Sequence, residues 1–411
     1  MRVLFLAPEP FFEERGTPIA VRLALEVLSN REKDEIILLT YSQGRECKIK
    51  GVKHIRCGPS FLKGIPPGPS LKKFITDIFF TFKVFSVVNR AEKEGKPFDL
   101  IHAVEESVYI AALLNKLKGI PYIYDMDSSL SLQMQEKYPF IKVFLPFFEK
   151  LEKSAIRNSC AVVPVCDALL EIAKKHGASQ TEVLRDISLL ETHECLSGEY
   201  GSKSNPLQLK KHLNLKENDK IALYVGNLEK YQGVDLLLDA FCHQSLKDKT
   251  FNLVIIGGAK KDINKYQEKY NHLVKQKKVH FIGPRPVPEL GSYLSQADVL
   301  VSPRIKGNNT PMKIYSYLHA GKPIVATDLP THRQVLNERN SILSPPDKES
   351  FAKALYKALT EPCQEIAREA RLLAEKEYSF EVFTKKLNKI YDLVDAQVNS
   401  TAKKRRLAVA S

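Results

Sequence analysis

The sequence predicts an α/β protein of two domains, each built on a parallel sheet with helices on both faces. The first observation is length, because 411 residues at about 100–200 residues per domain give two domains with a core each. The second is that short β-branched runs alternate with longer stretches of helical periodicity, which is typical of parallel strands joined by crossover helices. The third is a polar stretch at about residues 191–205, which interrupts this alternation before it restarts.

Eleven candidate strands carry the prediction of parallel sheets. Helical stretches such as Ile19–Leu28 and Val108–Lys118 separate them. The first half contains Arg2–Ala7, Ile36–Thr40, Leu100–Ala103, Tyr122–Tyr124, Ala161–Pro164 and Glu182–Leu184. The second half contains Ile221–Val225, Leu253–Ile256, Val279–Ile282, Val299–Ser302 and Ile324–Ala326.

The domain boundaries follow from the same pattern. We expect a first domain over residues 1–190, a linker over 191–205 and a second domain over 206–379. An amphipathic helix over 380–398 follows the second sheet and is expected to return to the first domain, and a basic flexible tail over 399–411 ends the chain. The halves share no close sequence repeat, so they are alike in pattern only.

Composition narrows the class of partner. The chain is 44% hydrophobic and 27% charged, which argues against disorder, and its net charge of +14 favours an anionic partner. The lysine-rich stretches Lys260–Lys269 and Lys275–Lys278 are typical of solvated helix faces, and no nucleic-acid-binding module is recognisable. We therefore expect no nucleic acid partner.

Cysteine usage and the first residues indicate the compartment. Seven cysteines with no C-x-x-C spacing predict neither a zinc site nor a disulfide framework, which fits a reducing compartment. Residues 1–8 have the pattern of a strand, with one arginine and no small-residue cleavage site. We expect a cytoplasmic protein without a signal peptide.

The most apolar long segment, Phe74–Val88, leaves two interpretations open. Asp77 and Lys83 interrupt it, so it is too short and too charged to cross a bilayer. Lys72-Lys73 precede it, and Pro139-Phe140 to Phe147-Phe148 add aromatic residues to the first domain, so both segments could lie on an anionic leaflet at the inner face of the membrane. Core helices would have the same pattern.

Ligands of open α/β sheets bind beyond the carboxyl ends of the strands, which directs attention to the residues there. After the first strand, Gly16 permits unusual backbone conformations, and Thr17-Pro18 has the pattern of an N-cap followed by proline at the first helical position. Free amide groups there could receive a phosphate or a sugar hydroxyl. The G-x-G-x-x-G fingerprint of nicotinamide and flavin enzymes is absent from this turn.

Two strands of the second domain end in glycine, and a third leads to basic residues. Gly226 precedes Asn227, and Gly257 ends the next strand, so a ligand could approach the backbone closely at both. Strand Val299–Ser302 then leads to Arg304 and Lys306. Thr310-Pro311 repeats the N-cap and N1 proline pattern, with Lys313 in the first turn of the helix. A cation there opposes the helix dipole unless an anion is bound, so we expect a phosphate group near Lys313.

Ordered motifs along nearly the whole chain resemble glycosyltransferase family 4, the retaining transferases with the GT-B fold. The motifs are EPFFEERGTPIAV, DLIHAVEES, YDMDSSL, LYVGNLEKYQGVDLLL, IGPRPVPEL, ADVLVSPR and TPMKIYSYLHAGKPIVAT. They resemble most the bacterial branch that assembles polysaccharides and glycolipids. The resemblance implies two Rossmann-like domains that face each other across a cleft.

The resemblance also implies the ligands and their places. A nucleotide-sugar, UDP- or GDP-linked, would be held mainly by the second domain as substrate, with no separate cofactor, and a glycan or lipid-linked acceptor mainly by the first. The donor diphosphate would meet the amides of Gly16-Thr17 and of the segment Asn309, Thr310, Pro311, Met312 and Lys313, with Arg304 and Lys313 as catalytic cations. The nucleotide base would lie near residues 285–287, next to Arg285 and Val287. No metal is implied, because amides and cations would neutralise the leaving diphosphate.

Five positions depart from the family pattern. Asn308 and Ser316 stand where two glutamates are usual, and the second of these usually binds the ribose. Asn227 and Gln232 replace an arginine and a lysine of the phosphate site, for which Arg304 and Lys313 would substitute. Asp127 stands where the branch commonly has a catalytic histidine. Separately, Glu105 and Glu106, just after a strand, are expected to contact the acceptor or the donor sugar.

These departures keep a second hypothesis open. An active glycosyltransferase is the favoured prediction, and a catalytically silent protein of the same fold, acting as a regulatory or assembly partner, is the alternative.

Overall fold

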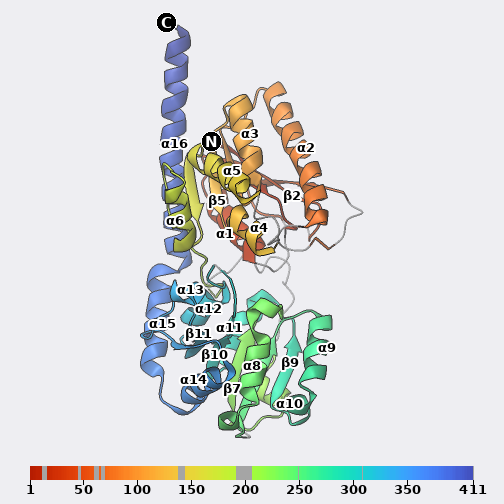
Figure 1. Cartoon of the computed structure of the whole chain (residues 1–411). Helices are drawn as coiled ribbons and strands as arrows, with labels where there is room; N and C mark the ends of the chain where they lie inside the picture. The colour runs from red at the N-terminus through yellow and green to blue at the C-terminus, as the bar shows by residue number, and fades with distance from the viewer. Residues whose placement is uncertain are drawn as a thin grey trace. The chain divides into compact units, whose positions relative to one another are not determined.

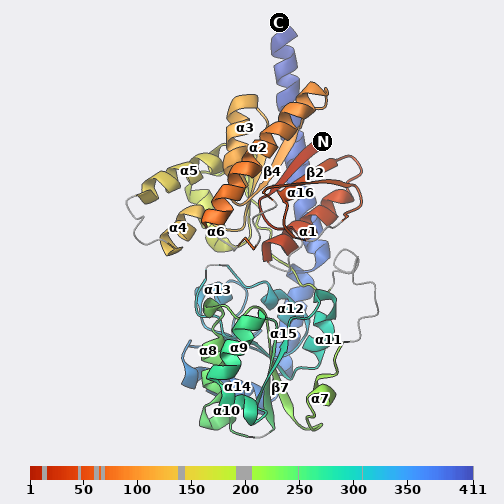
Figure 2. The same ribbon diagram turned by 90° about the vertical axis from the view of Figure 1, so that its right-hand side faces the viewer.

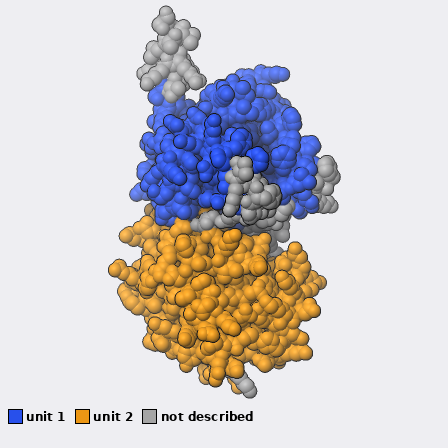
Figure 3. Space-filling model, in the orientation of Figure 1, with its two compact units in different colours: residues 1–185, 383–411 blue, residues 186–382 orange. Residues whose placement is uncertain are grey.

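The computed structural model describes residues 1–11, 16–44, 48–59, 64–65, 70–137, 144–190, 206–248, 250–307 and 309–410, the last ten as backbone only. It divides into two compact units. Unit 1 comprises residues 1–185 and 383–411, and unit 2 comprises residues 186–382 (Figure 3). The expected linker 191–205 lies outside the described residues, as do Pro139 and Phe140.

Unit 1 is built on a parallel six-stranded sheet in the order β3-β2-β1-β4-β5-β6 (Figure 1). Its strands are β1 (Arg2–Ala7), β2 (Glu35–Tyr41), β3 (Val52–Cys57), β4 (Leu100–Val104), β5 (Tyr122–Met126) and β6 (Ala161–Pro164). Its helices are α1 (Gly16–Ser29), α2 (Leu71–Lys93), α3 (Ser107–Lys118), α4 (Leu130–Lys137), α5 (Leu145–Arg157), α6 (Asp167–Lys175) and the part of α16 (Phe380–Ala410) from residue 383.

Alternation along the strands sends side chains to two helical layers. Leu4 and Leu6 of β1 share a core with Phe80 of α2, Leu114 of α3 and Ile156 of α5. In both views these three helices lie on the same side of the sheet (Figures 1 and 2).

The C-terminal helix returns to this unit, as the sequence predicts, and packs on the other face of its sheet. His102 of β4 stacks on Phe5, and its Nδ1 lies 2.9 Å from the Tyr391 hydroxyl of α16. Arg31 adds a hydrogen bond to Asn388 and an ion pair to Asp392, both at 2.9 Å.

Unit 2 repeats the architecture with the strand order β12-β11-β10-β7-β8-β9, again all parallel. Its strands are β7 (Lys220–Val225), β8 (Phe251–Ile256), β9 (Val279–Gly283), β10 (Val299–Ser302), β11 (Ile324–Thr327) and β12 (Ile342–Ser344). Its helices are α7 (Leu209–His212), α8 (Val234–Phe241), α9 (Lys260–Lys269), α10 (Asn271–Lys275), α11 (Leu290–Ser295), α12 (Lys313–His319), α13 (Pro330–Arg333), α14 (Lys348–Thr360) and α15 (Gln364–Glu377).

One predicted strand is wrong, and two strands escaped prediction. Glu182–Leu184 forms no strand of the sheet: its amides bond to the Val162 and Pro164 carbonyls of the edge strand β6, but the pairing amounts to an isolated bridge between Thr181 and Val162. The edge strand β3 has the sequence VKHIRC, whose half-exposed polar residues hide the β pattern. The edge strand β12 has only three residues, too few for a period to show.

Candidate functional site

In unit 2, a glycine follows the last residue of β7 and of β8, and these two glycines are in close contact. Gly226 has φ +149° and Gly257 has φ +110°, conformations that other residues rarely adopt. A Cβ on Gly257 would lie 2.2 Å from the Gly226 carbonyl oxygen, and one on Gly226 would lie 2.8 Å from Nζ of Lys313. Glycine at position 226 therefore leaves room for the lysine ammonium at this edge of the sheet.

Lys313 enters this edge from the first residue of α12. Its Nζ lies 3.9 Å from the centre of the Tyr224 ring and donates a hydrogen bond of 3.3 Å to Oε1 of Gln232. Tyr224 is held in turn by a bond of 2.6 Å from its hydroxyl to the Asn227 carbonyl. Both partners of the ammonium are thus uncharged, although a ring face does attract a cation.

The electrostatics around Lys313 are unfavourable for its charge. Burial lowers the pKa of the ammonium well below its ordinary value, and the nearby guanidinium of Arg304 lowers it further. An anion bound beside Lys313 and Gly226 would reverse both effects.

Arg304 is committed to its own loop. Its Nε donates to the Lys306 carbonyl at 2.7 Å and its Nη1 to the Asn309 carbonyl at 3.2 Å, and the guanidinium lies 5.2 Å from the Tyr231 ring centre. Arg304 therefore contributes charge to this edge and at the same time shapes the loop after β10.

The expected N-cap at Thr310 is wrong. Helix α12 begins at Lys313 with Met312 in the cap position, because the buried Thr310 hydroxyl donates instead to the Thr331 carbonyl at 3.0 Å. Pro311 therefore precedes the helix, and its carbonyl accepts from the Ile314 amide at 2.9 Å. Thr310 braces the loop and leaves the helix start uncapped by a side chain.

His332, which was not predicted from the sequence, connects the ends of β10 and β11. It is fully buried, with Nε2 2.9 Å from Ser302 Oγ and Nδ1 2.8 Å from the Thr327 carbonyl. Burial lowers the pKa of His332 to about 4, so the ring is neutral at pH 7. No motif marks this histidine, since its partners come from two other strands.

Ser316 is fixed inside unit 2. It is 1% exposed, and its Oγ accepts a hydrogen bond of 3.0 Å from the Leu189 amide. His319, one turn later on α12, lies 2.9 Å from Ser188 through its Nδ1. The position where the resemblance expects a ribose ligand thus holds the segment that begins this unit.

The remaining expected donor residues occupy several loops. Asn227 accepts from the Glu229 amide at 3.2 Å, which closes the turn after β7. Arg285 precedes a single helical turn at Val287–Glu289, and its buried Nε has no hydrogen-bond partner within the described chain. Asn308 lies outside the described residues, whereas Asn309 is described and accepts from Arg304.

In unit 1, the turn after β1 differs from its prediction. Helix α1 begins at Gly16, so Thr17 and Pro18 belong to the first turn and Thr17 does not form the expected cap. Proline is tolerated there because the first amides of a helix have no partner inside it. A Cβ on Gly16 would meet no atom of the described residues within 4 Å.

Carboxylates gather at the carboxyl ends of the unit 1 strands. Glu105, with φ +48°, and Glu106 follow β4, and both approach the ammonium of Lys73 on α2, Glu105 at 3.9 Å and Glu106 more closely. Glu9 follows β1, and its buried Oε1 has no hydrogen-bond partner among the described residues. The structure thus places Glu105 and Glu106 together, and adds Glu9 and Lys73, which the sequence analysis had not assigned to a site.

One ammonium does not balance these carboxylates. Burial and the neighbouring Glu106 raise the pKa of Glu105 to about 7, and burial raises the pKa of Glu9 well above its ordinary range. Asp77, which accepts from the Tyr41 hydroxyl, has its pKa raised to about 7 by burial and by Glu106. Such groups can accept hydrogen bonds from sugar hydroxyls or exchange a proton near pH 7.

Asp127 follows β5 directly and is partly buried, with polar contacts of its own. It lies at the same carboxyl edge of the sheet as Glu105, because β4 and β5 are paired in parallel. Over the described ranges, no cluster of three or more His, Cys, Asp or Glu side chains could hold a metal ion.

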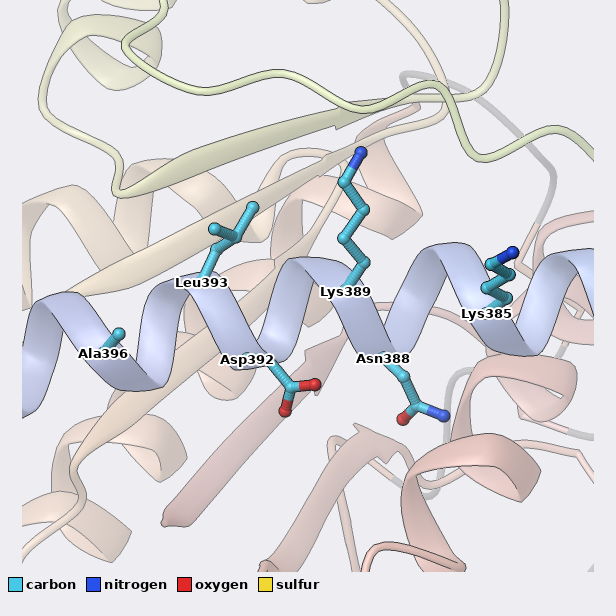
Figure 4. Close-up of a pocket in the computed structure, with 6 residues that line it drawn as sticks. All are labelled: Lys385, Asn388, Lys389, Asp392, Leu393 and Ala396. Carbon is cyan, nitrogen blue, oxygen red and sulfur yellow. The ribbon is translucent and has the colours of Figure 1, made fainter.

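A surface hollow along α16 has a structural explanation. Its lining residues are Lys385, Asn388, Lys389, Asp392, Leu393 and Ala396 (Figure 4). Asn388 and Asp392 bond to Arg31, and Lys389 pairs with Glu182 at 2.7 Å. These groups fasten α16 to the rest of unit 1.

A family model matches most of unit 2. Residues 207–376 match the family model of glycosyl transferases group 1. That stretch includes Gly226, Gln232, Arg304 and Lys313.

A curated relative extends the similarity beyond unit 2. Over 282 residues the chain is 25% identical to TuaC of Bacillus subtilis (strain 168). That relative is named as a teichuronic acid biosynthesis glycosyltransferase. The aligned stretch covers 68% of this chain and 65% of that relative, so it spans less than two thirds of the relative's length.

Solved structures share the GT-B fold over the whole chain. Sucrose-phosphate synthase from Thermosynechococcus elongatus superposes with a TM-score of 0.76 at 19% identity, covering 96% of this chain and 99% of that one. HepE of Anabaena in complex with UDP-glucose gives 0.68 at 17% identity, covering 95% and 99%. In the described part of this chain, no helix is long and apolar enough to cross a membrane.

Proposed function

We propose that the protein is a retaining, metal-independent glycosyltransferase of the hexosyltransferase type. It transfers a sugar from a nucleotide-sugar to a carbohydrate or lipid-linked acceptor, in the cytoplasm or at the inner face of the membrane. The observation that carries the proposal is the Lys313 ammonium, held against Gly226 and Gln232 with two uncharged partners at the carboxyl edge of the unit 2 sheet. A diphosphate is the anion that the matched family model and the motifs together favour.

UDP is the favoured nucleotide of the donor, with GDP as the second choice. The HepE structure of the same fold contains UDP-glucose, and that fact supports a uridine nucleotide here. The base would lie against the turn at Arg285–Val287, and the unpartnered Nε of Arg285 is available to an acceptor atom of the ligand.

The chemistry follows from charge placement. The bond between the sugar C1 and the phosphate oxygen breaks, and the acceptor oxygen bonds to C1 on the same face, while its proton passes to the departing phosphate. Lys313, with the charge of Arg304, stabilises the negative charge that develops on the leaving diphosphate, which takes the place of a metal ion. The carboxylates of Glu105 and Glu106 in unit 1 accept hydrogen bonds from hydroxyls of the acceptor or of the donor sugar, and Asp127 lies at the same sheet edge.

Thermal denaturation with UDP, GDP and ADP tests the donor assignment. A ligand at a hundred times its Kd stabilises the native state by about 2.7 kcal/mol, which raises the Tm of a domain of this size by about 5–10 °C. We expect UDP to give the largest shift, with and without EDTA. Equal shifts for all three nucleotides would contradict a base-selective site, and no shift at millimolar concentrations would contradict nucleotide binding.

The silent-partner alternative rests on Ser316 and Gln232, which lack the acidic and basic groups of the family pattern. Turnover separates the two functions. Sustained UDP-sugar binding without hydrolysis or transfer, over a panel of sugars and acceptors, would support the silent protein, and transfer with retained anomeric configuration supports the enzyme.

A further inference from the structure

Helix α5 carries a carboxylate on its buried face. Glu152, Ala155 and Ile156 are the buried residues of this helix, and Glu152 is 0% exposed. Ala155 and Ile156 pack in the core of unit 1, so the helical period places Glu152 on the side where an apolar residue is usual. A glutamate is almost never fully buried unless its oxygens have partners, because the loss of hydration is costly for a charged group. The partners of Glu152 therefore indicate its role.

Three consecutive residues at the start of α4 donate hydrogen bonds to Glu152. Its Oε1 accepts from the Leu130 amide at 3.0 Å, and its Oε2 accepts from the hydroxyls of Ser129 at 3.0 Å and of Ser131 at 2.8 Å. All three donors are uncharged groups. Helices α4 and α5 lie next to each other, so the carboxylate reaches this turn directly (Figures 1 and 2). One buried side chain thus fixes the backbone and two side chains of a single turn.

The turn that Glu152 holds follows the carboxyl end of β5. The last residue of this strand is Met126, whose carbonyl accepts an amide hydrogen bond of 3.2 Å from the residue after β6. Asp127 and Ser128 are the two residues between this anchor and the one at Ser129. Both are partly exposed, whereas Met126 and Ser129 are buried. The buried carboxylate therefore restricts a two-residue segment that reaches the carboxyl edge of the sheet.

Two simpler roles do not require a glutamate at position 152. Core packing alone favours an apolar side chain, since a hydrophobic residue of similar volume in place of a buried charge is often neutral or stabilising. The start of α4 does not need a charge from another helix, because Ser129 precedes α4 and its Oγ accepts from the Leu132 amide at 3.4 Å, as an N-cap does. The feature that does need the carboxylate is the fixed geometry of the turn after Asp127.

We infer that Glu152 is a positioning residue of the transfer reaction. It holds the turn after β5, so that Asp127 and Ser128 keep their place at the carboxyl edge of the unit 1 sheet, where they meet a sugar. Preorganisation of this kind depends on a supporting side chain that is itself locked by burial and hydrogen bonds. The inference rests on the proposed function, so its test combines a readout that needs no turnover with a kinetic readout.

Amide hydrogen exchange of the intact protein measures the order of the turn. Glu152→Met removes both acceptor oxygens, whereas Glu152→Gln keeps one acceptor for the Leu130 amide and gives the serine hydroxyls an amide group as their partner. We expect the Leu130 and Leu132 amides to exchange at least about ten-fold faster in Glu152→Met and within about three-fold of wild type in Glu152→Gln. Exchange in Glu152→Met that is as slow as in wild type would overturn the inference.

Turnover of UDP-glucose, UDP-galactose and UDP-N-acetylglucosamine gives the kinetic readout. In Glu152→Met we expect kcat to fall about 10- to 100-fold, because a small displacement of a positioned group has an effect of that size. The KM of the sugar nucleotide and the Kd of UDP should change by less than about three-fold, since the nucleotide is held by unit 2. Glu152→Gln should recover most of the lost kcat. A wild-type kcat in Glu152→Met would assign Glu152 a purely structural role.

A matched control removes a buried carboxylate elsewhere. Asp219 in unit 2 is 8% exposed and accepts from the Lys216 amide at 2.8 Å, but it precedes β7 and so lies at the amino end of its strand. We expect Asp219→Leu to leave kcat as in wild type. An equal loss of kcat in Asp219→Leu and Glu152→Met would show that any lost buried carboxylate has this effect, and the inference would fail.

A double-mutant cycle connects the turn to the reaction. If Glu152 acts through Asp127, Glu152→Met should lower kcat by less than about three-fold in the Asp127→Asn background, although it lowers kcat by about ten-fold or more in the wild-type background. Losses that multiply, or a wild-type kcat in Asp127→Asn, would overturn the inference. If the wild-type protein turns over none of the three sugar nucleotides, the proposed function is contradicted, and the exchange rates alone then decide whether Glu152 orders the turn.

Discussion

Replacement of Lys313 by methionine separates two effects of the ammonium charge. One is its effect on the free energy of unfolding, and the other is its contribution to UDP binding. Methionine keeps an unbranched side chain that is one atom shorter and apolar, and it removes the ammonium that lies over the Tyr224 ring. Without ligand we expect the free energy of unfolding to change by less than about 1 kcal/mol or to rise, because the lost charge is one that burial and Arg304 disfavour. UDP binding should weaken about 10- to 150-fold, because a charge-assisted hydrogen bond contributes about 1.5–3 kcal/mol. Calorimetric titration and urea denaturation measure the two effects.

The matched control is Lys261→Met on exposed α9, which should change neither quantity. Protonation provides a further readout. Because the lowered pKa of Lys313 should rise beside a diphosphate, UDP binding should take up protons over the pH range in which the free ammonium titrates, and in that range the binding enthalpy should differ between buffers of different ionisation enthalpy. The reasoning is refuted if Lys313→Met binds UDP as wild type does, or if it loses more than about 2 kcal/mol of stability without ligand.

An exchange of side chains tests whether position or identity matters. Lys313 donates to Gln232, which stands where the family pattern has a lysine. Lys313→Gln alone should lose UDP affinity about ten-fold or more. Gln232→Lys/Lys313→Gln should recover most of it, because the ammonium then reaches the same place from the turn before α8. If the single and the double variant lose the same amount of UDP affinity, Lys313 does not act on the diphosphate from this place.

Three further predictions concern stability and pH. His332 has a lowered pKa of about 4, so the stability that its neutral ring contributes is lost as pH falls from about 6.5 toward 4; the advantage of wild type over His332→Gln in urea denaturation should shrink by up to about 3 kcal/mol across that range. For Glu105 the pH dependence is reversed. Because its pKa is raised to about 7, the folded state loses stability as pH rises from about 4.5 to 7. Relative to wild type, the free energy of unfolding of Glu105→Gln should therefore be up to about 3 kcal/mol higher at pH 8 and the same at pH 4. Ser316→Ala removes the hydroxyl that accepts from the Leu189 amide and should cost about 0.5–1.5 kcal/mol at unchanged UDP affinity, whereas a ten-fold weaker affinity at unchanged stability would show that the hydroxyl binds ribose.

The sequence predicts the sheets well because their central strands are buried on both sides. Strand β10 was predicted with its observed bounds, and β7 and β8 to within two residues. Burial on both faces requires near-continuous apolar runs, which stand out from the helical period. The edge strand β3 was missed for the reverse reason, since its exposed side needs no apolar residue.

Helix starts were predicted less well, because a cap depends on where its hydroxyl finds a partner. Thr310-Pro311 has a favourable local pattern, yet the Thr310 hydroxyl bonds to Thr331, 21 residues later in the chain. Thr17-Pro18 fails differently, since α1 already begins at Gly16. Local patterns give the existence of these helices, and tertiary partners decide their first residue.

The candidate site follows the same division between local and distant information. The glycines at 226 and 257 and the cations Arg304 and Lys313 were predictable, because strand ends and short motifs mark them. The pairing of Lys313 with Gln232 joins residues 81 positions apart, and His332 lies 30 residues from its partner Ser302. Only the strand order of the folded sheet brings such residues together.

The two units carry opposite electrostatic imbalances, and each fits the ligand that we propose for it. In unit 2, Lys313 is buried beside another cation, so an anion lowers the free energy of the folded unit as it binds. In unit 1, the carboxyl groups of Glu9, Glu105 and Glu106 lie near a single cation, the ammonium of Lys73. They would repel a further anionic group, whereas they can accept a hydrogen bond from a hydroxyl group. A protein that only needed to fold would gain stability by exchanging some of these charges. Their retention in the folded chain is explained most simply if unit 2 receives the diphosphate and unit 1 receives sugar hydroxyls.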